Sequence, residues 1–177
     1  MIISISGKPG AGKTTVAKML AKKLGFKFYS IGDLRGEIAM KLGITIDELN
    51  EIGTKQEWTD KNVDEYQKEL GEKEDNFVID SWLGFHFIPK SKKIFLDVDP
   101  KEAAKRIFKD QRKDEPKMRN VEEVEKMLEK RVKNSLERYK KYYNINCFDK
   151  KNYDLVIDTT HMKPEDVVKR IMKFLKI

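Results

Sequence analysis

The sequence predicts an α/β fold with three layers, in which helices cover both faces of a five-stranded parallel sheet. Five short apolar runs with strand character alternate with helical patterns along the chain. No internal repeat, low-complexity tract or linker rich in Pro, Gly or Ser interrupts the 177 residues, so we expect a single domain over residues 1–177. Alternating strands and helices favour right-handed crossovers, and ligands then bind beyond the carboxyl ends of the strands.

The predicted strands are the apolar runs bounded by turn-forming or charged residues: 2–6, 26–30, 76–80, 93–98 and 154–158. The first predicted helix follows a Gly-rich turn, and three residues four apart share one of its faces: Val16, Leu20 and Leu24. Other helical patterns cover residues of about 32–42 and 121–143, and further helical segments fill residues 46–70. Asp99 and Pro100 predict another helix start, since Asp caps helices and Pro suits the first helical position, and Pro164 begins the last helix.

The composition disfavours several classes of protein. Hydrophobic residues make up 39% and charged residues 38% of the chain, and the clustering of the apolar residues argues against disorder. The single cysteine, Cys147, precludes an intramolecular disulfide and favours a reducing compartment. Residues 2–6 resemble a strand, and no apolar run is long enough to span a bilayer. We therefore expect a cytoplasmic protein without a membrane partner.

A phosphate-binding loop is the clearest motif. The pattern G-x-x-x-x-G-K-[ST] is matched at every defined position by Gly7, Lys8, Pro9, Gly10, Ala11, Gly12, Lys13 and Thr14. The match follows a predicted strand and opens a predicted helix, so its backbone N–H groups and the helix N-terminus are placed to bind phosphate. We expect this loop, with Thr15, to bind ATP: Lys13 contacts the β- and γ-phosphates, and Thr14 ligates Mg²⁺. The motif predicts a P-loop NTPase fold.

The P-loop predicts a bound nucleoside triphosphate but does not identify the acceptor of its phosphoryl group. GTPases need a base-reading N-K-x-D motif, and the chain contains none. The stretch from Asp33 to Gly36 spells D-x-x-G, yet it lies close to the P-loop and at the start of a predicted helix. The sequence therefore argues against a GTPase.

Two further motifs narrow the assignment. The first is an S-x-G-D turn within residues 29–35, and the second is the pattern R-x-x-x-S-x-x-R-Y from Arg131 to Tyr139. With the P-loop, these motifs resemble the nucleoside monophosphate kinases, and most closely the archaeal-type cytidylate kinases and cytidylate-kinase-like proteins, over nearly the whole chain. The resemblance implies ATP-dependent phosphorylation of a nucleoside monophosphate, with CMP or dCMP as the favoured acceptor and Mg²⁺ as the cofactor.

The resemblance also assigns regions and residues. It implies that residues of about 31–72 form a helical acceptor-binding region and residues of about 109–120 a short lid. The implied acceptor-binding residues follow the second and third strands: Ser30, Gly32, Asp33, Arg35 and Asp80. Asp80 is also expected to hold Mg²⁺ through water. Structural roles stay open as well, because Ser30 and Asp33 are good helix caps and Asp80 suits a strand-end turn.

Trp82 departs from the pattern of these kinases. Many of them have an arginine here, two residues after the acid at Asp80, which binds the acceptor phosphate. Tryptophan cannot take that role; it can fill the core or stack on a base. Arg35 also stands one position earlier than the arginine of many relatives, where this chain has Gly36.

Arginines are expected to close over the phosphates, because fixed guanidinium groups stabilise the charge on a γ-phosphoryl group in transfer. Arg131 and Arg138 are two helical turns apart and face one way, and Arg112 lies in the expected lid. Arg106 and Arg119 are weaker candidates. The predicted catalytic residues are Lys13, Arg112, Arg131 and Arg138.

Two other functions stay open. A kinase for AMP, UMP or a small non-nucleotide acceptor would use the same elements. A nucleic-acid-associated ATP-binding module is disfavoured, although most of the net charge of +7 lies between Lys101 and Tyr142, and basic and aromatic residues mix over 139–143. We expect a monomer whose ligands are ATP and a nucleoside monophosphate.

Overall fold

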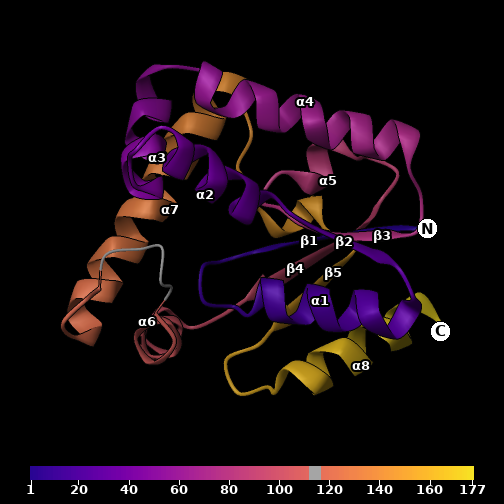
Figure 1. Ribbon diagram of the computed structural model, residues 1–177. Coiled ribbons are helices and arrows are strands. Elements are labelled where there is room, and N and C mark those ends of the chain that lie inside the picture. The colour runs from indigo at the N-terminus through magenta and orange to yellow at the C-terminus, as the bar shows by residue number, and fades with distance from the viewer. Residues whose placement is uncertain (112–116) are drawn as a thin grey trace.

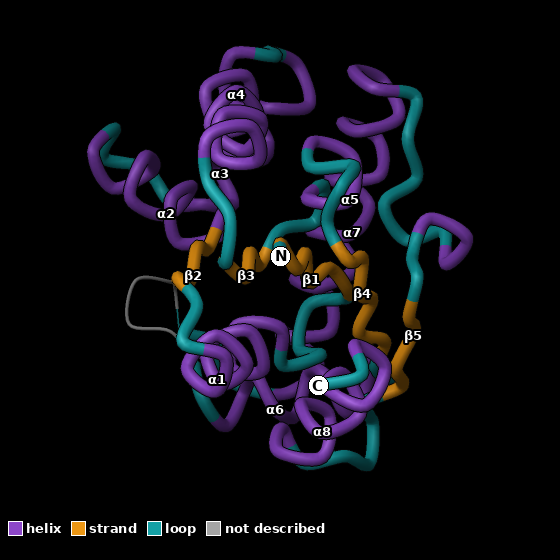
Figure 2. Tube along the Cα trace, turned by 90° about the vertical axis from the view of Figure 1, so that its right-hand side faces the viewer, coloured by secondary structure: helices purple, strands orange, loops and turns teal. Residues whose placement is uncertain are grey.

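The computed structural model describes residues 1–111 and 117–177, and it confirms the three-layer α/β prediction (Figure 1). Five parallel strands form one sheet in the order β2-β3-β1-β4-β5. They are β1 (Ile2–Gly7), β2 (Lys27–Ser30), β3 (Phe77–Asp80), β4 (Lys92–Asp97) and β5 (Leu155–Asp158). Figure 2 shows the sheet nearly edge-on, with α1 (Lys13–Leu24) and α8 (Pro164–Leu175) on one face and α4 (Trp58–Lys73) and α5 (Gly84–Phe87) on the other.

The remaining helices are α2 (Ile31–Lys41), α3 (Ile46–Lys55), α6 (Pro100–Lys109) and α7 (Val121–Tyr143), with a short 3₁₀ turn, η1 (Lys150–Asn152). Side-chain caps begin several of them. Ser30 accepts from a backbone N–H in the first turn of α2, and Asp99 and Asn120 do the same for α6 and α7. Thr45 and Glu48 form a reciprocal capping box at α3. The predicted helix starts at Asp99-Pro100 and Pro164 are confirmed.

The helical segments expected over 46–70 are α3 and α4, and Gln56, in an extended conformation, separates them. One detail differs from the prediction. The one-turn helix α5 is absent from the prediction, since four residues are too few to show a helical period. Both regions matter for the site, because α4 and the β3–α5 turn line it.

The central strand β1 explains how the layers pack. Ile3 and Ile5 are fully buried in the core formed with α1 and α8, each contributing about 1.5–3 kcal/mol through burial. The alternate residues are small: Ser4 shares a 2.8 Å hydrogen bond with Ser91, and Ser6 donates to the Ser81 carbonyl at 2.6 Å. These small side chains let the turn after β3 and α5 approach the other face of β1 closely.

The carboxyl ends of the strands all point toward one edge, where α2, α3, α6 and α7 lie (Figure 1). The long helix α7 packs against α3 on one side and α6 on the other. No helix in the described ranges is both long and apolar enough to cross a membrane. The arrangement leaves a cleft between the ends of the strands and this helical group, as expected for a parallel sheet.

Candidate functional site

The P-loop connects β1 to α1, and two of its glycines are required by geometry. Gly7 has φ of 148°, and a Cβ there would lie 2.1 Å from the carbonyl oxygen of Leu96 on β4. Gly10 has φ of 78°, and a Cβ there would lie 2.7 Å from the Cβ of Ala103 on α6. Because the N-cap of α1 is Gly12, which has no side chain to cap it, the N–H groups of the first turn stay available for an anion.

Lys13 extends back across this loop. Its Nζ donates to the carbonyl oxygen of Lys8 at 2.9 Å and lies 5.9 Å from the centre of the Trp82 ring. Burial lowers the pKa of Lys13, while the negative charge of Asp80 opposes that shift. The amine is therefore held over the loop in a desolvated position, where a phosphate would gain a strong electrostatic interaction.

Thr14 and Asp80 place two hard oxygen ligands beside the loop. The Thr14 hydroxyl donates to Asp80 Oδ2 at 2.5 Å, which links α1 to the end of β3. Hydroxyl and carboxylate oxygens suit Mg²⁺, which keeps several waters and binds substrate phosphates. The described residues contain no group of three or more His, Cys, Asp or Glu side chains suited to a metal. Thr14 and Asp80 therefore fit a metal held mainly by phosphate and water.

The cleft has a volume of about 350 Å³. It runs from the P-loop to the facing surfaces of α2, α3, α4 and α7, and it includes most of the predicted nucleotide- and acceptor-binding residues. Those that line it are Pro9, Gly10, Gly12, Lys13, Thr14, Thr15, Ser30, Gly32, Asp33, Arg35, Asp80, Arg131 and Arg138. Gly7, Lys8 and Ala11 do not line it, and Lys8 instead forms a 2.8 Å ion pair with Asp97.

Ser30 is the cap of α2, since its Oγ accepts from the backbone N–H of Asp33 at 3.1 Å. Asp33 itself lies in the first turn of α2 rather than at its cap. The N-termini of α2 and α1 both contribute backbone dipoles to the cleft. The capping role of Ser30 is compatible with the acceptor-binding role that the sequence predicts.

Arg35 and Arg138 are both buried, and both pair with Asp60 of α4. Arg35 donates to Asp60 Oδ1 at 2.7 Å and to the Thr59 carbonyl at 2.9 Å. The Nε of Arg138 lies 3.2 Å from Asp60 Oδ2. Asn50 of α3 accepts from Arg35 at 3.0 Å and from Arg138 at 3.1 Å. Four helices are joined through this cluster, which keeps a net positive charge for an incoming anion.

Two donors of this cluster are unsatisfied. Neither the Nε–H of Arg35 nor that of Arg138 donates a hydrogen bond within the described part of the chain, although both nitrogens are buried; the contact of Arg138 Nε with Asp60 is an ion pair only. Buried donors are almost always paired in native proteins, and an orphan in a cleft is typical of a site that a ligand completes. Both side chains line the cleft.

Sequence reasoning missed the polar face of α4. Asp60, Asp64 and Gln67 are buried and line the cleft, and Asn50 of α3 lies opposite them. Polar residues at spacings of four and three on one helical face are the signal that could have identified them. Apolar Val63 lies on the same face and masks the pattern.

The predicted arginines do not all lie in the same surroundings. Arg131 lines the cleft and forms a two-point ion pair with Asp47 of α3, at 2.7 and 3.0 Å. Arg138 lines it from one side of the buried cluster. The two face the same way, as their spacing predicts. Arg112 lies outside the described residues, and Arg119 is exposed at the start of α7.

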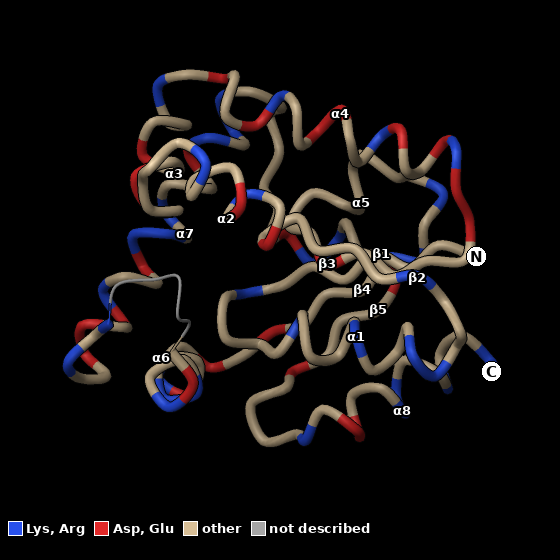
Figure 3. Tube along the Cα trace, in the orientation of Figure 1, with Lys and Arg blue, Asp and Glu red and all other residues tan. Residues whose placement is uncertain are grey.

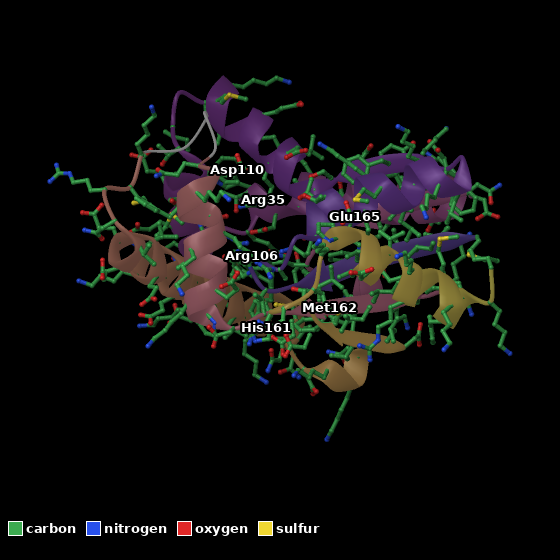
Figure 4. All side chains as sticks on the ribbon, turned by 90° about the horizontal axis from the view of Figure 1, so that it is seen from below. Arg35, Arg106, Asp110, His161, Met162 and Glu165 are labelled. Atoms are coloured by element: carbon green, nitrogen blue, oxygen red, sulfur yellow. The ribbon has the colours of Figure 1, made fainter. Side chains whose placement is uncertain are left out.

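Arg106 does not line the cleft and instead connects two elements of the fold. Its guanidinium donates to the carbonyl oxygens of Thr159 and Thr160 at 2.8 Å each, and its Nε pairs with Glu102 at 3.2 Å. Figure 4 shows Arg106 on α6 beside the turn that carries His161 and Met162. The side chain thus joins α6 to the turn after β5.

Trp82 packs against aromatic side chains and also reaches the cleft. Its ring packs edge-on against Tyr139 and Phe148, at centroid separations of 6.5 and 5.4 Å, and part of it lines the cleft beside Lys13. Packing accounts for its position, and the exposed part is an apolar wall. No guanidinium occupies this place, so the cluster of Arg35 and Arg138 is the main cationic group on the far side of the cleft among the described residues.

The tyrosines of α7 do not form a stacking surface for nucleic acid. Tyr139 is buried, Tyr142 donates to the Gly53 carbonyl at 2.8 Å, and Tyr143 donates to Asp64. Figure 3 shows basic and acidic residues interspersed along α6 and α7 rather than a single basic stripe. The mixing of basic and aromatic residues over 139–143 therefore gives less support to a nucleic-acid-associated module.

Comparisons with known proteins agree with this geometry. Residues 2–161 match the model of the cytidylate kinase-like family. A cytidylate kinase of Archaeoglobus fulgidus is 36% identical over 178 residues, which cover 100% of this chain and 96% of that protein. An S-adenosylmethionine-dependent nucleotide dehydratase of Lacinutrix mariniflava is also 36% identical, over 97% of this chain and 35% of that longer protein.

Solved structures resemble the fold as a whole. A shikimate kinase from Bacteroides thetaiotaomicron aligns with a TM-score of 0.68 and 20% identity, covering 100% of this chain and 99% of that one. At this identity the likeness supports the fold alone.

Proposed function

The chain belongs to the cytidylate kinase-like family and is a nucleoside monophosphate kinase, and from this premise we propose that it transfers the γ-phosphoryl group of ATP to CMP or dCMP. One observation carries the proposal. A single cleft joins the P-loop to the buried cluster of Arg35 and Arg138, whose Nε–H groups make no hydrogen bond within the described residues. A triphosphate on the loop and a monophosphate on the arginines would then meet end to end.

The chemistry follows from positioning and charge. An oxygen of the CMP phosphate forms a bond to the γ-phosphorus, the bond to the β–γ bridging oxygen breaks, and ADP leaves with that electron pair. No general base is needed, because the attacking oxygen is already anionic. Lys13 and the loop N–H groups neutralise the donor phosphates, while Arg131 and Arg138 stabilise charge on the transferred group.

Mg²⁺ would be held by Thr14 directly and by Asp80 through water. When bound, it would neutralise negative charge on the phosphates. Asp80 also keeps the Thr14 hydroxyl oriented, since the two groups are already hydrogen-bonded at 2.5 Å. The remaining ligands would come from phosphate and water.

The acceptor-binding region is proposed to span residues 31–72, because α2, α3 and α4 form the wall of the cleft opposite the P-loop. The lid over 109–120 stays a proposal, and its Arg112 lies outside the described residues. A monomer suffices for this function, since each residue invoked belongs to one chain.

A panel of acceptors tests the function. With ATP and Mg²⁺, ADP release measured by a coupled assay should require an acceptor, and kcat/KM for CMP or dCMP should exceed that for UMP and AMP by at least about 10-fold. Identification of CDP by chromatography completes the assay. A higher rate with AMP, UMP or a small alcohol would reassign the acceptor, and ADP release without any acceptor would contradict the proposal.

A further inference from the structure

The inner face of α4 carries polar residues where a packed helix normally carries apolar ones. Asp60, Asp64 and Gln67 lie on this face with exposures of 3%, 7% and 1%, and all three line the cleft. Asp60 forms ion pairs with Arg35 and Arg138. Asp64 and Gln67 are not required by the phosphate chemistry, and burying them is costly unless they are hydrogen-bonded.

A chain of hydrogen bonds fixes the direction of the Gln67 amide. Ser81 accepts from the backbone N–H of Leu83 at 3.2 Å, so its own hydrogen is available to donate to Gln67 Oε1 at 2.5 Å. Gln67 Nε2 then donates to Asp64 Oδ1 at 3.3 Å, and Tyr143 donates to Asp64 Oδ2. A reversed amide would bring its oxygen against the Asp64 carboxylate, which is unfavourable while that group is ionised.

These hydrogen bonds place a donor beside an acceptor, in a fixed order, on the wall of the cleft. The second N–H of Gln67 is a donor, and beside it the Asp64 carboxylate keeps lone pairs that accept. The base of CMP presents an acceptor, N3, beside a donor, the 4-amino group. Uracil presents the opposite order, an N3–H donor beside the O4 acceptor. The wall is therefore complementary to cytosine and mismatched with uracil.

Resting on the proposed function, we propose that Gln67 and Asp64 read the acceptor base, with Gln67 donating to cytosine N3 and Asp64 accepting from the 4-amino group. The acceptor phosphate then points toward Arg35 and the P-loop, which line the same cleft. Cytosine is selected over uracil by the order of the two hydrogen bonds, not by size.

The protonation of Asp64 provides a measurement that needs no substitution. Burial raises the pKa of Asp64 to about 7, against the opposing effect of the hydrogen bond from Tyr143; Asp60 raises it further, and Arg35 and Arg138 lower it.

Above pH 7 the Asp64 carboxylate accepts only, which favours cytosine. Below pH 7 its O–H can donate and the Gln67 amide can reverse, so both bases fit. The ratio of kcat/KM for CMP to that for UMP should therefore rise with pH through about 7. The two acceptors share the same phosphate titration, which cancels in the ratio.

The Asp64→Asn variant tests the proposal directly. It replaces an acceptor by an amide of the same shape that can donate to uracil O4. We expect the CMP-to-UMP ratio of kcat/KM to fall by on the order of 10²-fold and to lose its pH dependence. The matched control is Glu65→Gln, which removes one charge from the adjacent, exposed position of α4 and should leave the ratio unchanged. Circular dichroism and thermal unfolding establish that each variant is folded.

The outcomes separate this inference from the function on which it rests. A wild-type enzyme active on neither CMP nor UMP would overturn the proposed function and the inference with it. Activity on CMP with the same ratio in wild type and Asp64→Asn would overturn the inference alone. If that variant does not fold, a wild-type ratio that stays flat between about pH 6 and 8 overturns it instead.

Discussion

Replacing Lys13 by methionine should lower kcat for CMP phosphorylation by about 10³-fold or more, the cost of removing a fixed charge from a phosphoryl-transfer site. The Lys13 amine is the cation that lies over the P-loop, held by the Lys8 carbonyl at 2.9 Å. Its position is desolvated, as the lowered pKa indicates, so no water can replace the interaction fully. Methionine keeps an apolar stem against Trp82 but supplies no charge. Steady-state kinetics with saturating ATP, Mg²⁺ and CMP measure the effect.

The control is Lys18→Met, which removes one positive charge from the exposed side of the same helix. It should change kcat by less than about 3-fold, because exposed charges are screened by solvent and salt. The unfolding midpoints of both variants should stay near that of the wild type. Comparable turnover in Lys13→Met and wild type would remove Lys13 from the mechanism.

Replacing Asp60 by asparagine should destabilise the fold by about 3–5 kcal/mol, the usual cost of breaking a buried ion pair by removing one partner. Asp60 is the shared carboxylate between Arg35 and Arg138, and all three side chains are buried. The variant leaves two guanidinium groups buried with no compensating charge from Asp60. For a chain of this length the melting temperature should fall by about 6–20 °C, measured by circular dichroism.

The exposed pair Glu51–Lys130 is the matched control. It joins α3 to α7 at 3.0 Å, and both side chains are more than half exposed. Glu51→Gln should therefore cost no more than about 1 kcal/mol. Equal melting temperatures for Asp60→Asn and Glu51→Gln would show that the buried cluster contributes no more than a surface pair.

The fold was predictable because its signals are local. Each strand is a short apolar run, and residues such as Asp99, Pro100 and Pro164 mark helix starts through their own backbone chemistry. The point at which α3 ends and α4 begins was not predictable. Residues on both sides of Gln56 have helical character, and only tertiary packing decides where one helix stops.

The site was predictable where a motif fixes it and not where long-range pairing does. The P-loop glycines, Lys13 and Thr14 follow from one local pattern. The partners of Arg35 and Arg138 are different, because α4 and α7 are far apart in the chain and meet only in the folded protein. Asp60 therefore looked like any surface acid on a charged helix. The placement of Arg106 on the turn after β5 was hidden for the same reason.

An analogue that joins adenosine and cytidine through five phosphates tests most directly whether one cleft holds donor and acceptor end to end. If the P-loop and the Arg35–Arg138 cluster bind the two halves together, the analogue should bind on the order of 10²–10⁴-fold more tightly than ATP or CMP alone, as measured by isothermal titration calorimetry. ATP and CMP should each compete with the analogue. An affinity no higher than that of ATP, with no competition from CMP, would contradict a shared cleft.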